Sequence, residues 1–317
     1  MQVFVDTANL DEIRAAMSWG VVDGVTTNPS LIKKEVERLK AAGQQVDMDC
    51  HIRNILQTVD AEHPVSLEVT ATDAAGMVAQ GKALFQKYNQ VAQNVVIKIP
   101  VNTYAGNSFE GLRAIKSLDD AEIPVNCTLV FTPEQALLAA AAGATYVSPF
   151  AGRVDDYIRQ QSGIEFSKGD YFPAEGWEAE ADEEEDVEED MLDDNGIVSG
   201  VDLVTKIADL FEKHEVDCNI IAASLRNPRQ VRQVALAGAD IGTIPFAVLK
   251  AMMQHAKTKE GMEKFTADIV PEYQALLGGS APAQPARPTP AQQTQPSAQP
   301  KPQPSAHDLI NRQRGGG

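Results

Sequence analysis

The chain contains 317 residues, of which 43% are hydrophobic, and it carries a formal net charge of −18 at pH 7. This apolar content is sufficient for one large hydrophobic core. There is no uninterrupted run of about 18 apolar residues and no basic leader followed by an apolar stretch, so we expect neither a membrane span nor secretion but a cytoplasmic protein.

Short apolar segments alternate with longer helical stretches over the first 250 residues. The expected strands are residues 3–6, 24–27, 65–69, 95–99, 125–130, 146–150, 220–224 and 241–244. Eight such units predict a single (β/α)8 TIM barrel, an α/β fold with its catalytic residues at the C-terminal ends of the strands. A doubly wound open sheet is the alternative, but residues 6–9 lack the glycine-rich phosphate turn that usually follows its first strand.

The fourth expected strand contains Lys98 within the apolar run VVIKIP at residues 95–100. A strand buried on both faces rarely holds an unpaired ammonium group, because burial disfavours the charged form of an amine. A neutral amine is a nucleophile, so Lys98 is a candidate Schiff-base lysine. On the run alone, an edge-strand lysine that reaches solvent is an equally good interpretation.

The alternation of side chains along each strand favours the catalytic interpretation. Polar residues occupy the barrel-facing positions of most strands, and together they exceed what barrel packing requires. This inward set comprises Asp6, Glu68, Lys98, Asn126, Thr128 and Ser148, with Phe150 on the side of Ser148 and with Ser224 and Arg226 completing the set.

Six segments resemble the transaldolase family, whose small-subunit branch also contains the fructose-6-phosphate aldolases. They are FVDTA (residues 4–8), GVTTNPS (24–30), VIKIP (96–100), NCT (126–128), SPFAGR (148–153) and ASLRN (223–227). The resemblance extends over about residues 1–270, with one insertion. It implies a class I (β/α)8 enzyme that needs no metal or other cofactor and moves a dihydroxyacetone unit between sugar phosphates of the pentose phosphate pathway.

The resemblance also implies a role for each site residue. Lys98 would form the Schiff base with C2 of a ketose phosphate, Asp6 would take the C4 hydroxyl proton, and Glu68 with Thr128 would hold the water that shuttles protons. The expected donors are sedoheptulose 7-phosphate and fructose 6-phosphate, and the acceptors glyceraldehyde 3-phosphate and erythrose 4-phosphate. The substrate would be bound by Asn28 and Asn126 at its hydroxyls and by Arg153, Ser224 and Arg226 at its phosphate.

Three positions favour transfer to an acceptor over free aldol cleavage. Phe150 stands where the aldolases are expected to carry a tyrosine that protonates and releases the three-carbon unit, and phenylalanine has no hydroxyl to donate. Glu68 and Ser148 replace a glutamine and an alanine of the aldolase branch. Phe150 could instead be a barrel-filling aromatic, and fructose-6-phosphate aldolase activity remains the alternative function.

The cysteines and histidines suggest no metal centre. Cys50, Cys127 and Cys218 are widely spaced and fit free thiols in a reducing compartment. The run DMDCH at residues 47–51 places its side chains around a helix, where they would not converge on one ion.

The acidity of the chain is local. Of the 45 acidic residues, 12 lie within residues 178–194, which contain no lysine or arginine. The resemblance implies that this run lengthens a loop that is shorter in the family, so residues of about 159–196 are expected to form an insertion in the barrel. Disorder or a solvated protrusion is the simplest interpretation of its acidic part, and docking to a basic partner or adaptation to high salt is the alternative; nucleic acid and membranes are poor candidate partners.

We expect the barrel to occupy residues 1–278 and a proline-, glutamine- and alanine-rich tail to occupy 279–317. The tail cannot form a core, but residues 306–314 could form a short helix that binds a scaffold or shell; a frayed terminus is the alternative. The resemblance implies a homo-oligomer, a pentamer or decamer, with the C-terminal helix on a neighbouring subunit. A barrel retained mainly as an interaction platform is the competing hypothesis for the whole chain.

Overall fold

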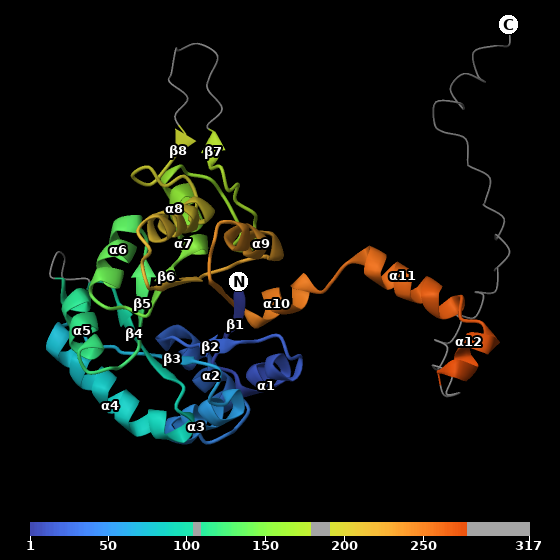
Figure 1. The fold of residues 1–317 in the computed structure, drawn as a ribbon, viewed down its shortest axis with the longest axis horizontal. Coiled ribbons are helices and arrows are strands. Elements are labelled where there is room, and N and C mark those ends of the chain that lie inside the picture. Colours follow the sequence, from blue (N-terminus) through green and yellow to red (C-terminus); the bar gives the residue numbers. More distant parts are fainter. Residues whose placement is uncertain (104–108, 179–190, 278–317) are drawn as a thin grey trace, which may run out of the picture. The chain divides into compact units, whose positions relative to one another are not determined.

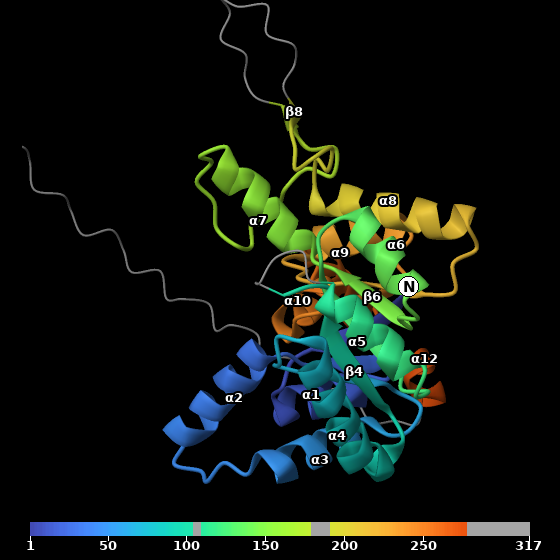
Figure 2. The same ribbon diagram turned by 90° about the vertical axis from the view of Figure 1, so that its left-hand side faces the viewer.

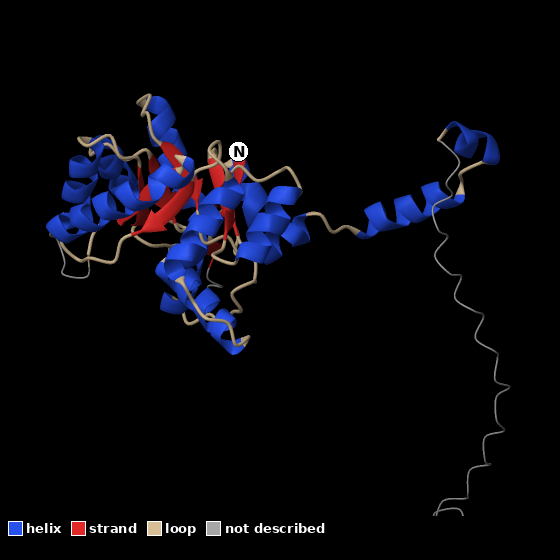
Figure 3. Ribbon diagram, turned by 90° about the horizontal axis from the view of Figure 1, so that it is seen from below, coloured by secondary structure: helices blue, strands red, loops and turns tan. Residues whose placement is uncertain are grey.

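The structure, a computed structural model, describes residues 1–103, 109–178 and 191–277 (Figure 1). Eight parallel strands close into a barrel in the order β1-β10-β9-β6-β5-β4-β3-β2, and helices surround it on the outside (Figures 1 and 3). The predicted (β/α)8 barrel is therefore confirmed. Its strands are β1 (Gln2–Asp6), β2 (Gly24–Thr26), β3 (Val65–Glu68), β4 (Val95–Pro100), β5 (Val125–Val130), β6 (Tyr146–Pro149), β9 (Asn219–Ala222) and β10 (Ile241–Ile244).

Each strand leads into a helix, and the connection after β2 holds two. The helices of the barrel are α1 (Leu10–Ser18), α2 (Pro29–Ala41), α3 (Met48–Val59), α4 (Ala74–Ala92), α5 (Glu110–Asp119), α6 (Pro133–Ala141), α7 (Ala151–Gln161), α8 (Gly200–Lys213), α9 (Pro228–Leu236) and α10 (Phe246–Met252). Side-chain oxygens cap the first turns of many of them, among them Asn28, Ser199 and Asn227. These caps satisfy backbone N–H groups that the helix leaves free and fix where each helix begins.

The two faces of the barrel sheet contribute to separate hydrophobic clusters. Val5 belongs to the large cluster between strands and helices, whereas Phe4 packs with Ile221 and Ile241 in a small one. This separation follows from the alternation of side chains across a strand. At Gly24 an added Cβ would lie 2.7 Å from the ring of Phe4, so glycine leaves the space that this ring fills.

A two-stranded antiparallel sheet interrupts the connection between α7 and α8. It consists of β7 (Trp177–Glu178) and β8 (Met191–Leu192) and lies outside the barrel (Figures 1 and 2). Most of the acidic run predicted to protrude lies outside the described residues.

The segment that leads to β7 is packed against the barrel helices. The guanidinium of Arg159 on α7 stacks on the rings of Phe166 and Phe172, 4.9 Å from each centroid, and Phe172 is 3% exposed. Gln233 on α9 donates to the hydroxyl of Tyr171 at 2.9 Å. These contacts fix the first part of the insertion to α7 and α9.

The chain divides into two compact units, Met1–Gln254 and His255–Gly317. The first contains the whole barrel. The second contains α11 (Ala256–Ala267) and α12 (Pro271–Leu276), and the predicted tail at 279–317 lies outside the described residues. Over the described ranges, none of the helices is long and apolar enough to span a membrane.

Candidate active site

Lys98 lies inside the barrel and is 4% exposed. Its Nζ is 3.3 Å from Glu68 Oε2 and donates to the backbone carbonyl of Thr27 at 3.4 Å. Glu68 is the register partner of Lys98 on β3, and Asn126 is its partner on β5. Parallel pairing thus places a carboxylate, an amine and an amide side by side at one level of the barrel.

Asp6 ends β1 and is held by a chain of hydroxyl groups. Thr26 Oγ1 donates to Asp6 Oδ1 at 2.7 Å and lies 2.5 Å from Thr243 Oγ1. Because Thr26 has one hydroxyl proton and gives it to the carboxylate, Thr243 donates to Thr26. The chain runs across three neighbouring strands, β10, β1 and β2, and fixes the orientation of the carboxyl group.

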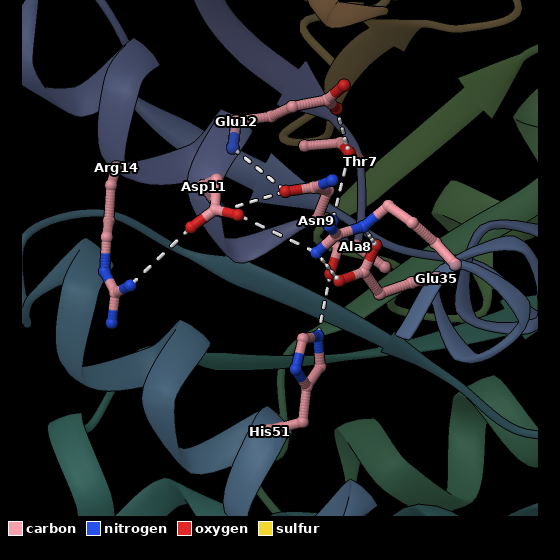
Figure 4. Close-up of polar contacts among 9 residues, drawn as sticks. Thr7, Ala8, Asn9, Asp11, Glu12, Arg14, Glu35 and His51 are labelled. Atoms are coloured by element: carbon pink, nitrogen blue, oxygen red, sulfur yellow. Dashed lines mark hydrogen bonds and ion pairs between the residues drawn. The ribbon is translucent and has the colours of Figure 1, made fainter. Parts of the chain in front are cut away.

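The segment after Asp6 is held in place by the neighbouring helices (Figure 4). Thr7 Oγ1 donates to Glu12 at 2.6 Å, Asn9 caps the first turn of α1, and His51 Nε2 on α3 lies 2.8 Å from the carbonyl oxygen of Ala8. Asp6 forms part of the wall of a pocket of about 270 Å³ between this segment, α2 and the start of α10. These contacts hold the segment that follows Asp6, and Asp6 itself borders the pocket.

The two carboxyl groups share an electrostatic environment with Lys98. Desolvation raises the pKa of Asp6, while the charge of Lys98 and the hydrogen bond from Thr26 oppose the rise. Desolvation likewise raises the pKa of Glu68, against the charges of Lys98 and Arg153, and Asp6 raises it further. Carboxyl groups whose pKa values lie above the usual range exchange protons more readily near neutral pH, as general acids and bases must.

Asn126 on β5 is fully buried and connects β3 with β6. Its Nδ2 donates to Ser66 Oγ at 3.2 Å, and its Oδ1 accepts from Ser148 Oγ at 2.7 Å. The hydroxyl of Thr128 on the same strand is fully buried and has no hydrogen-bond partner among the described residues. A buried hydroxyl without a partner is costly, so Thr128 offers a free donor and acceptor to a bound molecule.

The ring of Phe150 lies near both the lysine and an arginine. Its ring centroid is 5.9 Å from Lys98 Nζ and 4.9 Å from the guanidinium carbon of Arg153, and its ring packs on Phe131 at 5.8 Å. Phe150 directly precedes α7, and Arg153 lies in the first turn of that helix. The arginine charge is thus held beside the barrel mouth by an aromatic face.

Arg226 follows β9 and pairs with α7. Its Nη2 donates to Asp156 Oδ2 at 2.9 Å, while its Nε has no acceptor among the described residues. A Cβ on Gly152 would lie 2.1 Å from the carbonyl oxygen of Ser224 and 2.7 Å from Arg226 Nε, so only glycine allows this approach. Ser224 itself has φ +63°, a left-handed conformation that is strained for a side-chain-bearing residue.

Asn28 has a structural task in addition to the binding role expected from the sequence. Its Oδ1 accepts from Leu31 N at 3.0 Å and caps α2, which leaves the Nδ2 donors for a ligand. Among the residues predicted from the sequence, the structure brings Lys98 into contact with Glu68 and near the Phe150 ring, which Arg153 also approaches. The charge of Lys98 also acts on Asp6. Arg226 is instead joined to Asp156, a partner that the sequence did not suggest.

Four polar residues of the site were missing from the sequence-based set. The alternation rule that identified Glu68 also places Ser66 inward, and the same rule finds Thr26 and Thr243. Asp156 could not be found in this way, because its contact with Arg226 joins residues 70 positions apart.

A closed (β/α)8 barrel with these polar groups at the C-terminal ends of its strands defines the chain as a TIM-barrel enzyme. Residues 3–277 match the family model described as transaldolase/fructose-6-phosphate aldolase. A probable transaldolase of Thermoplasma acidophilum is 42% identical over 280 residues, which cover 87% of this chain and 100% of the relative.

Two further relatives give the same result. Probable transaldolases of Chlorobium chlorochromatii and Aquifex aeolicus are 42% and 40% identical over 268 residues, covering 84% of this chain and 97% and 96% of the respective relatives. The chain belongs to the transaldolase and fructose-6-phosphate aldolase family.

Proposed function

We propose that the protein is a transaldolase that transfers a dihydroxyacetone unit from a ketose phosphate to an aldose phosphate through a Schiff base on Lys98. The observation that carries this proposal is the buried Lys98 Nζ, 3.3 Å from Glu68 and close enough to Asp6 for its charge to oppose the rise in the pKa of that carboxyl group. A lysine amine beside a carboxylate that can take its proton can attack a carbonyl carbon, and the neighbouring carboxyl groups can return protons at later steps.

The reaction begins when Lys98 attacks C2 of the ketose phosphate. Glu68 Oε2 is close enough to Nζ to take its proton, and Thr128, whose buried hydroxyl lacks a described partner, supplies the second contact for a water molecule. The carbinolamine then loses water to give the Schiff base. Asp6 removes the C4 hydroxyl proton, the C3–C4 bond breaks and an aldose phosphate leaves.

The three-carbon enamine stays bound to Lys98 until an acceptor aldehyde arrives. The enamine carbon attacks this aldehyde, Asp6 returns the proton to the new hydroxyl group, and hydrolysis of the Schiff base releases the product ketose. Asn28, Asn126 and Ser148 would hold the dihydroxyacetone hydroxyls during the exchange. The Asn126–Ser148 hydrogen bond of 2.7 Å pre-orients two of these groups.

The phosphate group would bind between Arg153, Ser224 and Arg226. A guanidinium presents paired N–H donors to phosphate oxygens and stays charged at any working pH. Arg226 Nε has no described acceptor, so its N–H is free to donate to a phosphate oxygen. We infer the substrate pairs from the family to which the chain belongs: sedoheptulose 7-phosphate or fructose 6-phosphate as donor, with glyceraldehyde 3-phosphate or erythrose 4-phosphate as acceptor, as in the pentose phosphate pathway.

Transfer is favoured over free aldol cleavage because of Phe150. Its ring lies 5.9 Å from Lys98 Nζ and offers no hydroxyl proton to the enamine. The complete set of Lys98, Asp6, Glu68 and Thr128 likewise favours an active enzyme over a barrel retained as an interaction platform.

The test of the Schiff base is reductive trapping. Incubation with fructose 6-phosphate and borohydride should attach a three-carbon adduct to Lys98, and Lys98→Arg should abolish both adduct and turnover. Lys82→Arg, at an exposed position of α4, is the matched control and should behave as the parent protein. An adduct on another lysine, or turnover by Lys98→Arg, would refute the assignment.

We also propose that the protein is a cytoplasmic homo-oligomer, a pentamer or decamer. Six apolar side chains of the C-terminal unit are more than half exposed: Met262, Phe265, Val270, Tyr273, Leu276 and Leu277. Packing of this surface on a neighbouring copy would remove it from water. The double variant Phe265→Asp/Leu276→Asp should lower the mass in sedimentation equilibrium, and an unchanged mass would contradict the proposal.

A scaffold or shell partner for residues 306–314 is a further proposal, testable by co-purification with and without those residues.

A further inference from the structure

Asp155 is a buried carboxylate for which the proposed reaction has no use. It lies on α7, is 4% exposed, and makes one contact with each of two other helices. Its Oδ1 accepts from Gly200 N, in the first turn of α8, at 2.7 Å. Its Oδ2 accepts from the side-chain amide of Gln230 on α9, also at 2.7 Å.

Gln230 passes this contact on to the phosphate site. Its Oε1 accepts from the backbone N–H of Arg226 at 2.8 Å, and its side chain is buried. A backbone N–H can only donate, so the amide oxygen must face Arg226 and the amide nitrogen must face Asp155. The group at position 155 must then be an acceptor, which an ionised carboxylate is at both oxygens.

Arg226 is also held from the side of α7. Asp156 pairs with its guanidinium at 2.9 Å, and Gly152 allows the loop to approach the helix closely. Asp155 controls the backbone of Arg226 through Gln230, whereas Asp156 controls its side chain directly. Gly152, Asp155 and Asp156 recur at helical spacing, so one face of α7 meets the loop that carries Ser224 and Arg226.

We propose that Asp155 and Gln230 are positioning residues of the phosphate site: the ionised carboxylate orients the Gln230 amide, which in turn holds the Arg226 backbone so that its guanidinium meets the phosphate. This inference rests on the proposed function and extends it to two residues that touch neither the substrate nor Lys98.

Protonation of Asp155 would break the chain of contacts. The O–H of a protonated carboxyl group would face either Gly200 N–H or the Gln230 amide nitrogen. Both of these groups are donors, so the hydrogen bond to that oxygen would be lost. If the amide flips to accept from Asp155, its nitrogen faces the N–H of Arg226, which also donates. Burial raises the pKa of Asp155 to about 7. The charge of Asp156, on the same helix, also raises this pKa. The charge of Arg159 on α7 and the hydrogen bonds from Gly200 N–H on α8 and Gln230 on α9 lower it.

The first experiment compares Asp155→Asn with the parent protein on donors with and without phosphate. The variant should raise KM for fructose 6-phosphate about tenfold at pH 8, leave kcat within about twofold, and leave kcat/KM for unphosphorylated fructose unchanged. Asp209→Asn makes the same chemical change at an exposed position of α8 and should have no effect. An unchanged KM for fructose 6-phosphate, or an equal loss on both donors, would overturn the proposal.

The double variant Asp155→Asn/Gln230→Glu is the rescue. Asn at 155 would accept from Gly200 N–H and donate to Glu at 230, whose other oxygen would accept from Arg226 N–H, so every hydrogen bond returns and the total charge is kept. KM for fructose 6-phosphate should recover to within about threefold of the parent value. Failure to recover in a folded double variant contradicts the relay. If Asp155→Asn does not fold, Gln230→Met removes only the amide and should show the same rise in KM.

The dependence of KM for fructose 6-phosphate on pH distinguishes a positioning role of Asp155 from a purely structural one. In the parent protein KM for fructose 6-phosphate should rise as pH falls from 8 to 6, whereas Asp155→Asn should retain only the smaller change caused by the substrate phosphate. Identical profiles would reject the proposal. Failure of the proposed function is distinct, because the parent protein would then show neither a borohydride adduct nor turnover.

Discussion

Glu68 Oε2 lies 3.3 Å from Lys98 Nζ, and the two residues face each other as register partners of adjacent strands. Their contact is therefore set by the barrel itself and not by a loop. Strand pairing keeps both side chains on the inner face, because a shift of one residue would turn them toward the helices. The proposed nucleophile and its proposed proton acceptor are in this way positioned by the strands of the barrel.

Glu68→Gln should slow the reaction about 100-fold or more. The amide keeps the shape of the side chain but cannot take the proton of Lys98, and general acid–base groups contribute factors of this size. Single-turnover trapping with borohydride should show slower adduct formation, with the folded state intact by circular dichroism. Glu62→Gln, at an exposed position, is the control. Trapping at the parent rate would show that another group accepts the proton.

Phe150→Tyr should raise the rate at which free dihydroxyacetone forms from fructose 6-phosphate. The added hydroxyl can protonate the enamine that the Phe150 ring leaves undisturbed in the parent protein. The measurement compares cleavage and transfer with and without erythrose 4-phosphate. Phe85→Tyr, on the helix α4, supplies a hydroxyl away from Lys98 and should change neither rate. Rapid cleavage by the parent protein would place it in the aldolase branch.

Asn28 combines a helix cap with a proposed substrate contact, and two substitutions separate them. Asn28→Ser retains a capping oxygen for Leu31 N, whereas Asn28→Ala does not, so only the alanine variant should lose about 1 kcal/mol of stability. Both variants lack the Nδ2 donors and should lose activity to a similar extent. Recovery of activity in Asn28→Ser would show that capping is the only role of this residue.

The acidic run and the tail should be dispensable for turnover. Glu178 and Met191 are paired across β7 and β8, so residues 179–190 can be replaced by Asn-Gly, a dipeptide suited to a two-residue hairpin turn. This variant and a chain truncated after Leu277 should keep turnover within about threefold. Loss of turnover in the hairpin variant would assign the acidic run to the active site.

Phe172→Ala, in the first part of the insertion, should by contrast destabilise the barrel by about 3–5 kcal/mol in urea unfolding, because Arg159 packs on this buried ring.

Asp155 should make stability depend on pH in a defined direction. Its pKa is about 7 in the folded protein against an ordinary value of 3.8, so between these values the folded state binds a proton that the unfolded chain does not. The free energy of unfolding should therefore fall as pH rises through this window, by at most about 1.4 kcal/mol per pH unit. Urea unfolding at pH 5 and pH 7.5 should show this decline relative to Asp155→Asn. A difference between the two proteins that does not change with pH would contradict the prediction.

The alternation of side chains predicted which candidate residues lie inside the barrel, because it depends only on local geometry. Glu68, Lys98 and Asn126 lie in strands whose apolar neighbours mark the outer face, and the observed strand ends differ from the predicted ones by at most two residues. The rule fails at Ser224. β9 ends at Ala222 and Ser224 takes a left-handed conformation, so its direction does not follow from counting along the strand.

The sequence alone was enough to predict the eight strands and the inward polar side chains, because both depend on hydrophobic patterns within a few residues. It favoured a closed barrel over an open sheet, and the structure shows the barrel closed. The pairing of Asp156 with Arg226, 70 residues away, and the contact of Asp155 with Gln230, 75 residues away, became visible only in the folded protein. The closed barrel also brings Lys98 and Arg153 to the same aromatic ring, that of Phe150. Such contacts depend on how the closed barrel brings successive β/α units together, and no pattern of neighbouring residues records those distances.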